Sequence, residues 1–159
     1  MIKAVVTDFS QVILLPIDSS YTGGLNALHK KLSECGDYDF WSHFQLNKEL
    51  LSFYAILSKA IDVYVFTAEY IQEHPALEAD LKGVFKAVFS GARLGLLKTD
   101  PEAYAILATT IGRLPEEILY IDDRQENIDA ARQAGMEGIR FESNGQAICD
   151  LRTMCGFTE

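Results

Sequence analysis

The chain has 159 residues, of which 48% are hydrophobic and 23% charged, and its formal net charge is −9. This length and apolar content fit one core, so we expect residues 1–159 to form a single domain. The acidic balance argues against nucleic acid or an anionic membrane as a partner, because the chain has no basic surface to replace their counterions.

Two further features limit the cellular setting. The N-terminus reads MIKAVV and lacks the long apolar run of a signal peptide, so we expect a cytoplasmic protein. The three cysteines, Cys35, Cys149 and Cys155, form no CxxC pair and lie near no histidine cluster. Neither a disulfide framework nor a zinc site is therefore indicated.

Short β-type runs alternate with helical patterns along most of the chain. The predicted strands are, in chain order, residues 3–7, 62–66, 87–89, 118–121 and 138–141. The predicted helices are residues 47–58, 101–111 and 125–134, and the second of them is the best marked, with Asp100 as its cap and Gly112 at its end. This alternation predicts an α/β fold, with a parallel sheet covered by helices on both faces.

Residues 16–45 look inserted between the first strand and the helix 47–58. They contain the sequence YTGG, a short helical pattern at 25–32, and a cluster of aromatic residues, namely Tyr38, Phe40, Trp41 and Phe44. Tyr38, Phe40 and Trp41 are candidate contacts for a large substrate or a partner protein, or alternatively part of a small cluster packed on the domain.

Polar side chains stand where four predicted strands end. Asp8 ends the first strand, Thr67 the second and the pair Asp122–Asp123 the fourth, while Lys98 lies in the loop after the third. Because ligands of open parallel sheets bind beyond the carboxyl ends of the strands, we expect these side chains to face one small volume. Adjacent acids need a cation or hydrogen-bond donors, although acids that open a helix are also favoured by its dipole.

Four stretches resemble, in the right order, the haloacid dehalogenase-like (HAD) superfamily. They are VVTDFSQVIL, VYVFTAEY, SGARLGLLKTDPEAYAIL and ILYIDDRQENIDAARQAGM. The resemblance extends from residue 2 to about residue 142. It implies a Rossmann-like, doubly wound parallel sheet with strand order 5-4-1-2-3 and, as in most members, a Mg²⁺-dependent phosphatase.

The resemblance also implies roles for the polar residues. Asp8 matches the nucleophile that attacks phosphorus and becomes a transient aspartyl phosphate. Thr67 matches the residue that holds the phosphoryl oxygens, and Lys98 the cation that offsets the negative charge gathered there.

The implied metal ligands are carboxylate and carbonyl oxygens, which suit Mg²⁺. Asp8, the backbone carbonyl of Ser10 and Asp123 would bind the ion, and Asp122 would be either another ligand or an acid that supports the ligands. Asn127, one helical turn after Asp123, is either a hydrogen-bond partner in the site or a residue of the helix surface.

Ser10 departs from the family pattern, because most phosphatases of the family carry a second aspartate at this position. That aspartate protonates the leaving group and later activates water, and such help accelerates a reaction by about 10²- to 10⁴-fold. A serine hydroxyl does not perform this proton transfer, so we expect a phosphohydrolase that is weak on ordinary phosphate monoesters. The alternative is a catalytically inactive HAD-like protein with a binding or regulatory role.

Other chemistries and classes fit less well. The leaving groups of acyl phosphates and activated aryl phosphates depart without a proton, so these compounds are candidate substrates. Dehalogenation needs no metal and would leave the pair Asp122–Asp123 without a role. Receiver domains place their acid pair after the first strand, and no GxGxxG follows any strand as in dinucleotide-binding domains.

The inserted residues 16–45 are too few for a full cap over the site. We therefore expect an open site that takes a small phosphorylated substrate, or one that a macromolecule covers.

Overall fold

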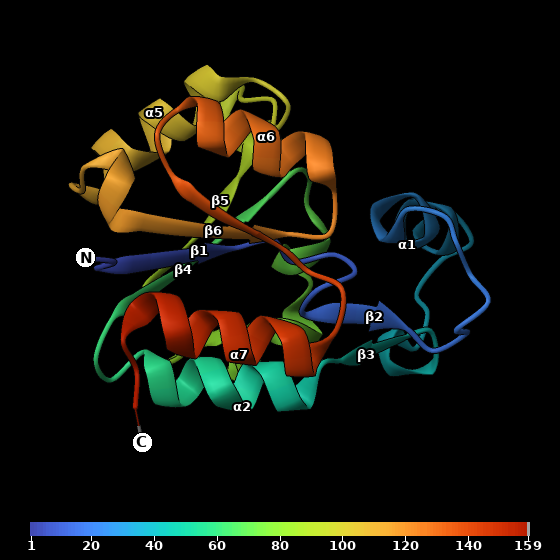
Figure 1. Cartoon of the computed structure of the whole chain (residues 1–159). Helices are drawn as coiled ribbons and strands as arrows, with labels where there is room; N and C mark the ends of the chain where they lie inside the picture. Colours follow the sequence, from blue (N-terminus) through green and yellow to red (C-terminus); the bar gives the residue numbers. More distant parts are fainter. Residues whose placement is uncertain (159) are drawn as a thin grey trace.

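A five-stranded parallel sheet lies at the centre of the computed structural model, which describes residues 1–158 (Figure 1). Its strands are β1 (Ala4–Thr7), β4 (Asp62–Thr67), β5 (Ala87–Ser90), β6 (Ile118–Asp122) and β7 (Glu137–Arg140). They lie in the order β5-β4-β1-β6-β7. With the five strands numbered along the chain and read from β7, this is 5-4-1-2-3, so the predicted fold class and strand order are confirmed.

Helices cover both faces of the sheet. The longer ones are α2 (Lys48–Leu57), α5 (Pro101–Ile111), α6 (Gln125–Gln133) and α7 (Asn144–Cys155). Figure 1 shows α5 and α6 on one face and α2 and α7 on the other. Side chains of successive strand residues point to opposite faces, so Val5 and Leu119 pack with the α2–α7 layer, and Val6 and Tyr120 with the α5–α6 layer.

The helix boundaries follow from their caps. The side chain of Asp100 accepts a hydrogen bond from the backbone N–H of Glu102 at 2.9 Å, and Gly112 ends α5 in the left-handed conformation, with φ of 70°. Both were predicted. The C-terminal helix α7 was not, although Ser143 caps it by accepting a hydrogen bond from Gln146 N.

A small antiparallel pair of strands, β2 (Leu14–Pro16) and β3 (Phe44–Leu46), frames the inserted residues. The predicted limits 16 and 45 fall inside this pair. The segment between the two strands, residues 17–43, carries α1 (Leu25–Glu34) and the 3-10 helix η1 (Phe40–Ser42). Figure 1 shows this inserted segment beside the sheet, joined to it by β2 and β3.

Short helices fill the remaining connections. They are η2 (Ile71–Glu73), η3 (Pro75–Leu77), α3 (Glu78–Leu81), α4 (Gly91–Leu94) and η4 (Pro115–Glu117). Within residues 1–158, no helix has the length and apolarity needed to cross a lipid bilayer.

Tyr38 is the centre of an aromatic cluster between the inserted segment and the sheet domain. Its hydroxyl lies 2.6 Å from Nδ1 of His29, and its ring centroid lies 5.6 Å from that of His43 and 6.2 Å from that of His74. Phe40 stacks on His74 and is buried, so it is part of the core and not of an open contact surface.

Candidate active site

Asp8 is fixed by the end of the central strand. Its backbone N–H donates to the carbonyl of Ile121 at 2.8 Å, and its own carbonyl accepts from the hydroxyl of Thr7 at 3.0 Å. The chain then folds back, with the N–H of Leu14 donating to the carbonyl of Phe9. This turn leaves the Asp8 carboxyl at the carboxyl end of β1, where sequence reasoning expects a ligand site.

Lys98 joins two acids that come from neighbouring strands. Its Nζ lies 2.7 Å from Oδ1 of Asp8 and 2.7 Å from Oδ2 of Asp122. All three side chains are buried, and the hydroxyl of Tyr104 holds the loop by donating to the carbonyl of Lys98 at 2.7 Å. One ammonium group therefore balances two buried carboxylates.

Asp122 is saturated with further donors. Its Oδ2 accepts from the hydroxyl of Tyr120 at 2.6 Å and from Nδ2 of Asn127 at 3.0 Å, and its Oδ1 accepts from the backbone N–H of Arg124 at 2.9 Å. Asn127 thus lies in the site and not on the helix surface. Tyr120 was not predicted, but its place two residues before Asp122 puts both side chains on the same face of β6.

Burial and the neighbouring charges determine the protonation of Asp8, Asp122 and Lys98. Burial raises the pKa of Asp8 to about 7, an effect that Lys98 opposes and the charge of Asp122 reinforces. Burial acts in the same direction on Asp122, but the Lys98 ammonium and the hydrogen bond from Tyr120 hold its pKa below the ordinary value. The pKa of Lys98 is raised although burial favours its neutral form, because both acids stabilise its charge. Lys98 and Asp122 are therefore both held in their charged forms, whereas burial shifts Asp8 toward its neutral form.

Asp123 adds a third carboxylate. Burial, and next the charge of Asp122, raises its pKa. One oxygen each of Asp8, Asp122 and Asp123 lies within 4.8 Å of the others. Since Lys98 already pairs with two of the three acids, the group as a whole still has an excess of negative charge.

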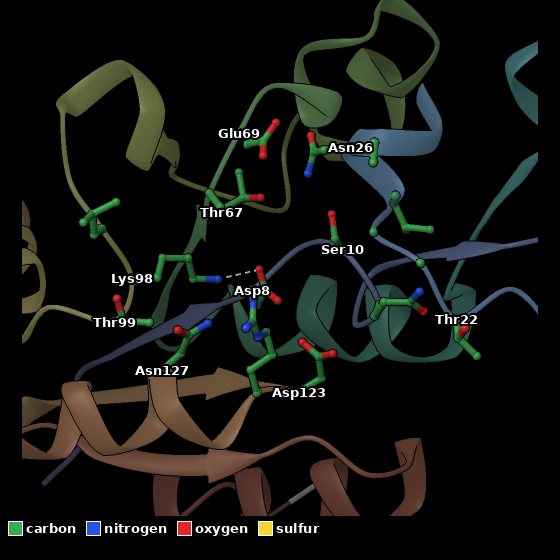
Figure 2. Close-up of a pocket in the computed structure, with 18 residues that line it drawn as sticks. Asp8, Ser10, Thr22, Asn26, Thr67, Glu69, Lys98, Thr99, Asp123 and Asn127 are labelled. Carbon is green, nitrogen blue, oxygen red and sulfur yellow. Dashed lines mark hydrogen bonds and ion pairs between the residues drawn. The ribbon is translucent and has the colours of Figure 1, made fainter. Parts of the chain in front are cut away.

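These side chains open into a pocket of about 520 Å³ (Figure 2). Of the residues named for the site from the sequence, the structure brings six to its wall: Asp8, Ser10, Thr67, Lys98, Asp123 and Asn127. Asp122 is fully buried and does not line the pocket. It contacts the site through Lys98 and through Asn127, which lines the pocket.

The pocket wall also includes polar residues that were not predicted, among them Asn26 and Glu69. Asn26, in the first turn of α1, accepts hydrogen bonds from the backbone N–H groups of Tyr70 and Ile71, at 3.2 and 3.0 Å, and so joins the inserted segment to the loop after β4. Glu69 lies in that loop, and Figure 2 shows it beside Thr67. No pattern in the sequence separates either residue from other polar loop residues.

Ser10 has an unusual environment. Its Oγ is enclosed and makes no hydrogen bond to any of the described residues, although the residue lines the pocket. This hydroxyl therefore adds no hydrogen bond to the described structure and remains available to a group bound in the pocket.

The pattern of the sequence matches a known family over most of the chain. The model of the haloacid dehalogenase-like hydrolases, a hydrolase family, matches residues 4–135. Among curated proteins, an enolase-phosphatase E1 of Shewanella frigidimarina is 34% identical over 102 residues, which cover 59% of this chain and 44% of that protein. The mouse bifunctional epoxide hydrolase 2 is 27% identical over 77 residues, which cover 48% of this chain and 14% of that protein. The chain therefore spans less than half the length of these relatives.

Solved structures share the fold at low sequence identity. A HAD-superfamily hydrolase of subfamily IA from Geobacter sulfurreducens has a TM-score of 0.67 and 18% identity, covering 95% of this chain and 100% of that one. A HAD family enzyme of Bacteroides thetaiotaomicron, crystallised with magnesium and inorganic phosphate, has a TM-score of 0.66 and 13% identity, covering 89% and 95%. Because the family model matches well over half of its residues, the chain belongs to the haloacid dehalogenase-like hydrolases.

Proposed function

We propose that this protein is a Mg²⁺-dependent phosphohydrolase in which Asp8 is the nucleophile. The observation that carries the proposal is the position of Lys98 Nζ, 2.7 Å from both Asp8 and Asp122, at the wall of a pocket beyond the carboxyl ends of β1 and β6. Curated relatives named as phosphatases support the choice of a phosphate ester. Because the chain covers less than half of those relatives, their substrates are not carried over.

The donors present fit Mg²⁺. Asp8 and Asp123 offer hard carboxylate oxygens to the pocket, together with the backbone carbonyl of Ser10. Three acids stand against the one ammonium group of Lys98, and this excess of negative charge favours a cation here. The saturated oxygens of Asp122 favour its supporting role over that of a ligand.

Each side chain then has a separate task. The Asp8 carboxylate attacks phosphorus, and Lys98 offsets the charge that gathers between Asp8 and the phosphoryl group. Thr67, which is buried at the pocket wall, donates its hydroxyl to a phosphoryl oxygen. Asp122 keeps Lys98 charged and in place. When bound, Mg²⁺ supplies further positive charge to the phosphoryl oxygens.

Ser10 determines which substrates turn over quickly. It cannot donate a proton to an alkoxide, so ordinary monoesters react slowly unless another side chain supplies that proton. Acyl phosphates and activated aryl phosphates, whose leaving groups need no proton, react faster. The inserted segment 17–43 acts as a reduced cap in this proposal. It leaves room for a small phosphorylated substrate, or for a macromolecule that completes the cover.

A non-catalytic binding or regulatory protein is the second candidate, and Ser10 is the specific observation that favours it. One experiment separates the two: p-nitrophenyl phosphate and acetyl phosphate are assayed with Mg²⁺ for the wild type, Asp8→Asn and Ser10→Asp. The phosphohydrolase proposal requires turnover that disappears in Asp8→Asn. With phenyl phosphate as a third substrate, whose leaving group is poor, it also expects Ser10→Asp to speed hydrolysis more than it does for p-nitrophenyl phosphate.

The binding or regulatory alternative predicts the opposite result. If none of these substrates is turned over by the wild type or by Ser10→Asp, while inorganic phosphate still binds in the presence of Mg²⁺, the protein is a binding module. Asp129→Asn is the matched control, because Asp129 is an exposed acid on α6 outside the pocket wall.

A further inference from the structure

The roles given above include no side chain that donates a proton to the leaving group. One carboxyl group of the pocket has no role so far. Three acids line the pocket: Asp8, Asp123 and Glu69. Asp8 is paired with Lys98, and Asp123 belongs to the acid cluster that suits a cation. Glu69 belongs to neither group.

The backbone of Glu69 is held firmly while its side chain is free. Its carbonyl accepts hydrogen bonds from Ser90 Oγ at 2.7 Å and from Gln72 Nε2 at 2.7 Å. The next two N–H groups, of Tyr70 and Ile71, donate to Asn26 of the inserted segment. Within the described part of the chain, the Glu69 carboxylate has no hydrogen bond or ion pair. Its position is thus fixed by neighbours that leave the carboxylate available to a substrate.

Glu69 also lies on the appropriate side of the nucleophile. Figure 2 shows Ser10, Thr67 and Glu69 on one side of Asp8, and Asp123 on the other. Ser10 stands at the position where most relatives carry the proton-transferring aspartate, and its enclosed hydroxyl has no partner among residues 1–158. A carboxyl group two residues after Thr67 enters the pocket from the same side.

We propose that Glu69 is a catalytic residue that performs the proton transfers for which Ser10 is unsuited. This inference rests on the proposed function. In the first step Asp8 forms a bond to phosphorus, the bond from phosphorus to the leaving oxygen breaks, and the Glu69 carboxyl gives its proton to that oxygen. In the second step the Glu69 carboxylate takes a proton from water as the water oxygen bonds to phosphorus, and the bond to Asp8 breaks. The net reaction is hydrolysis of the ester, with both acids restored.

A different role is possible for a free carboxylate in a phosphate pocket, namely binding a cationic group of the substrate. The two roles differ in their dependence on the leaving group. A proton donor matters most when the leaving oxygen is strongly basic, whereas a group that only binds substrate affects a series of uncharged aryl leaving groups equally.

The test compares phenyl phosphate with p-nitrophenyl phosphate, with Mg²⁺ present, for the wild type and Glu69→Gln. We expect kcat/KM for phenyl phosphate to fall by about 10²-fold, at the low end of general acid catalysis, and that for p-nitrophenyl phosphate to fall by less than about 10-fold. Glu73→Gln is the matched control on the same loop, because its carboxylate pairs with Arg93 and does not line the pocket.

A second readout isolates the second step. Acetyl phosphate needs no proton for its leaving group, so Glu69→Gln should still phosphorylate Asp8 but release phosphate slowly, and intact mass spectrometry should detect the phosphorylated chain. Equal losses for the two aryl esters, or no trapped phosphoenzyme, overturn the role of Glu69. Failure of the proposed function itself looks different: the wild type would turn over neither aryl ester, which overturns both proposals, or Asp8→Asn would retain turnover of both.

Discussion

Lys98 is the residue at which two buried negative charges meet. Its ammonium group contacts Asp8 and Asp122, and its aliphatic stem carries Nζ to within 5.7 Å of the ring centroid of Phe66 and 5.8 Å of that of Tyr120. A buried ion pair is expensive to break, because removing one partner leaves the other charge without compensation. Here one substitution leaves two such charges.

We therefore expect Lys98→Met to lower the free energy of unfolding by about 3–5 kcal/mol, the range found when a buried pair is broken. Lys86→Met is the matched control, because Lys86 forms an exposed pair with Asp62 at 3.0 Å. Such surface pairs contribute at most about 1 kcal/mol. Urea denaturation of both variants measures the difference, and equal losses would contradict the ion-pair assignment.

Asp8 makes the stability of the metal-free protein depend on pH. Its pKa is about 7 in the folded chain against an ordinary value of 3.8, so the folded state binds this proton more tightly than the unfolded state. The stabilisation is complete below the ordinary value and is lost as the pH rises through about 7. Asp122, whose pKa is lowered, has the opposite slope, but only below its ordinary value of 3.8.

With EDTA present to remove metal ions, Asp8 should therefore contribute a few kcal/mol to the free energy of unfolding, on the order of its pKa shift. This contribution should fall between about pH 4.5 and 8. Asp8→Asn has no proton to lose and should remove that contribution. Denaturant titrations at four or five pH values test this. An unchanged pH slope in Asp8→Asn would show that other groups cause it.

Gly91 shows how an element far from Asp8 in sequence positions the site. It is the first residue of α4, and a Cβ atom there would lie 2.7 Å from the carbonyl oxygen of Leu96 and 3.4 Å from that of Ala68. Both contacts are with backbone, which cannot rotate away. The loops after β4 and before Lys98 therefore approach each other only because residue 91 has no side chain.

We expect Gly91→Ala to lower the free energy of unfolding by about 1–3 kcal/mol, as overpacking does, and to reduce turnover by displacing Lys98. Gly145→Ala is the control, because a Cβ at Gly145 would meet no atom within 4 Å. In a helix that change should be neutral or stabilising by up to about 1 kcal/mol. Thermal unfolding and kinetics of both variants provide the comparison.

Local signals explain which elements could be predicted. Helix α5 was found because Asp100, Pro101 and Gly112 mark its ends, and the main strands because they are short, continuous apolar runs. The pair β2–β3 was missed because each strand has three residues and its partner is about thirty residues away, so only tertiary contacts define it. Helix α7 has a mixed apolar and polar sequence, and its pattern is weak without the sheet beneath it.

At the scale of the whole molecule, the sheet order brings the site together. β1 lies between β4 and β6, so Asp8, Thr67 and Asp122 end adjacent strands although more than a hundred residues separate the first from the last. Sequence reasoning could anticipate this grouping, because parallel strands end at one edge. It could not anticipate Asn26, Glu69 or the donors to Asp122, since these positions depend on loop paths and side-chain orientation.

Mg²⁺ should stabilise the whole fold. A ligand at 100 times its dissociation constant adds about 2.7 kcal/mol, which raises the Tm of a chain of this size by roughly 5–10 °C. The gain should be larger at pH 8 than at pH 5.5, because the ion competes with the proton that Asp8 holds below about pH 7. Differential scanning calorimetry with and without Mg²⁺ measures it. Asp123→Asn should abolish the gain, and Asp129→Asn should keep it.

The cluster around Tyr38 also gives the inserted segment spectroscopic signals of its own. His29, His43 and His74 are the three histidines of the chain, and all of them contact Tyr38 or its neighbours. The single tryptophan, Trp41, lies against Phe40 in the same region. Imidazole proton resonances and indole emission of the unlabelled protein consequently report on this one junction, so a change at the junction on ligand binding can be followed by spectroscopy without introducing a probe.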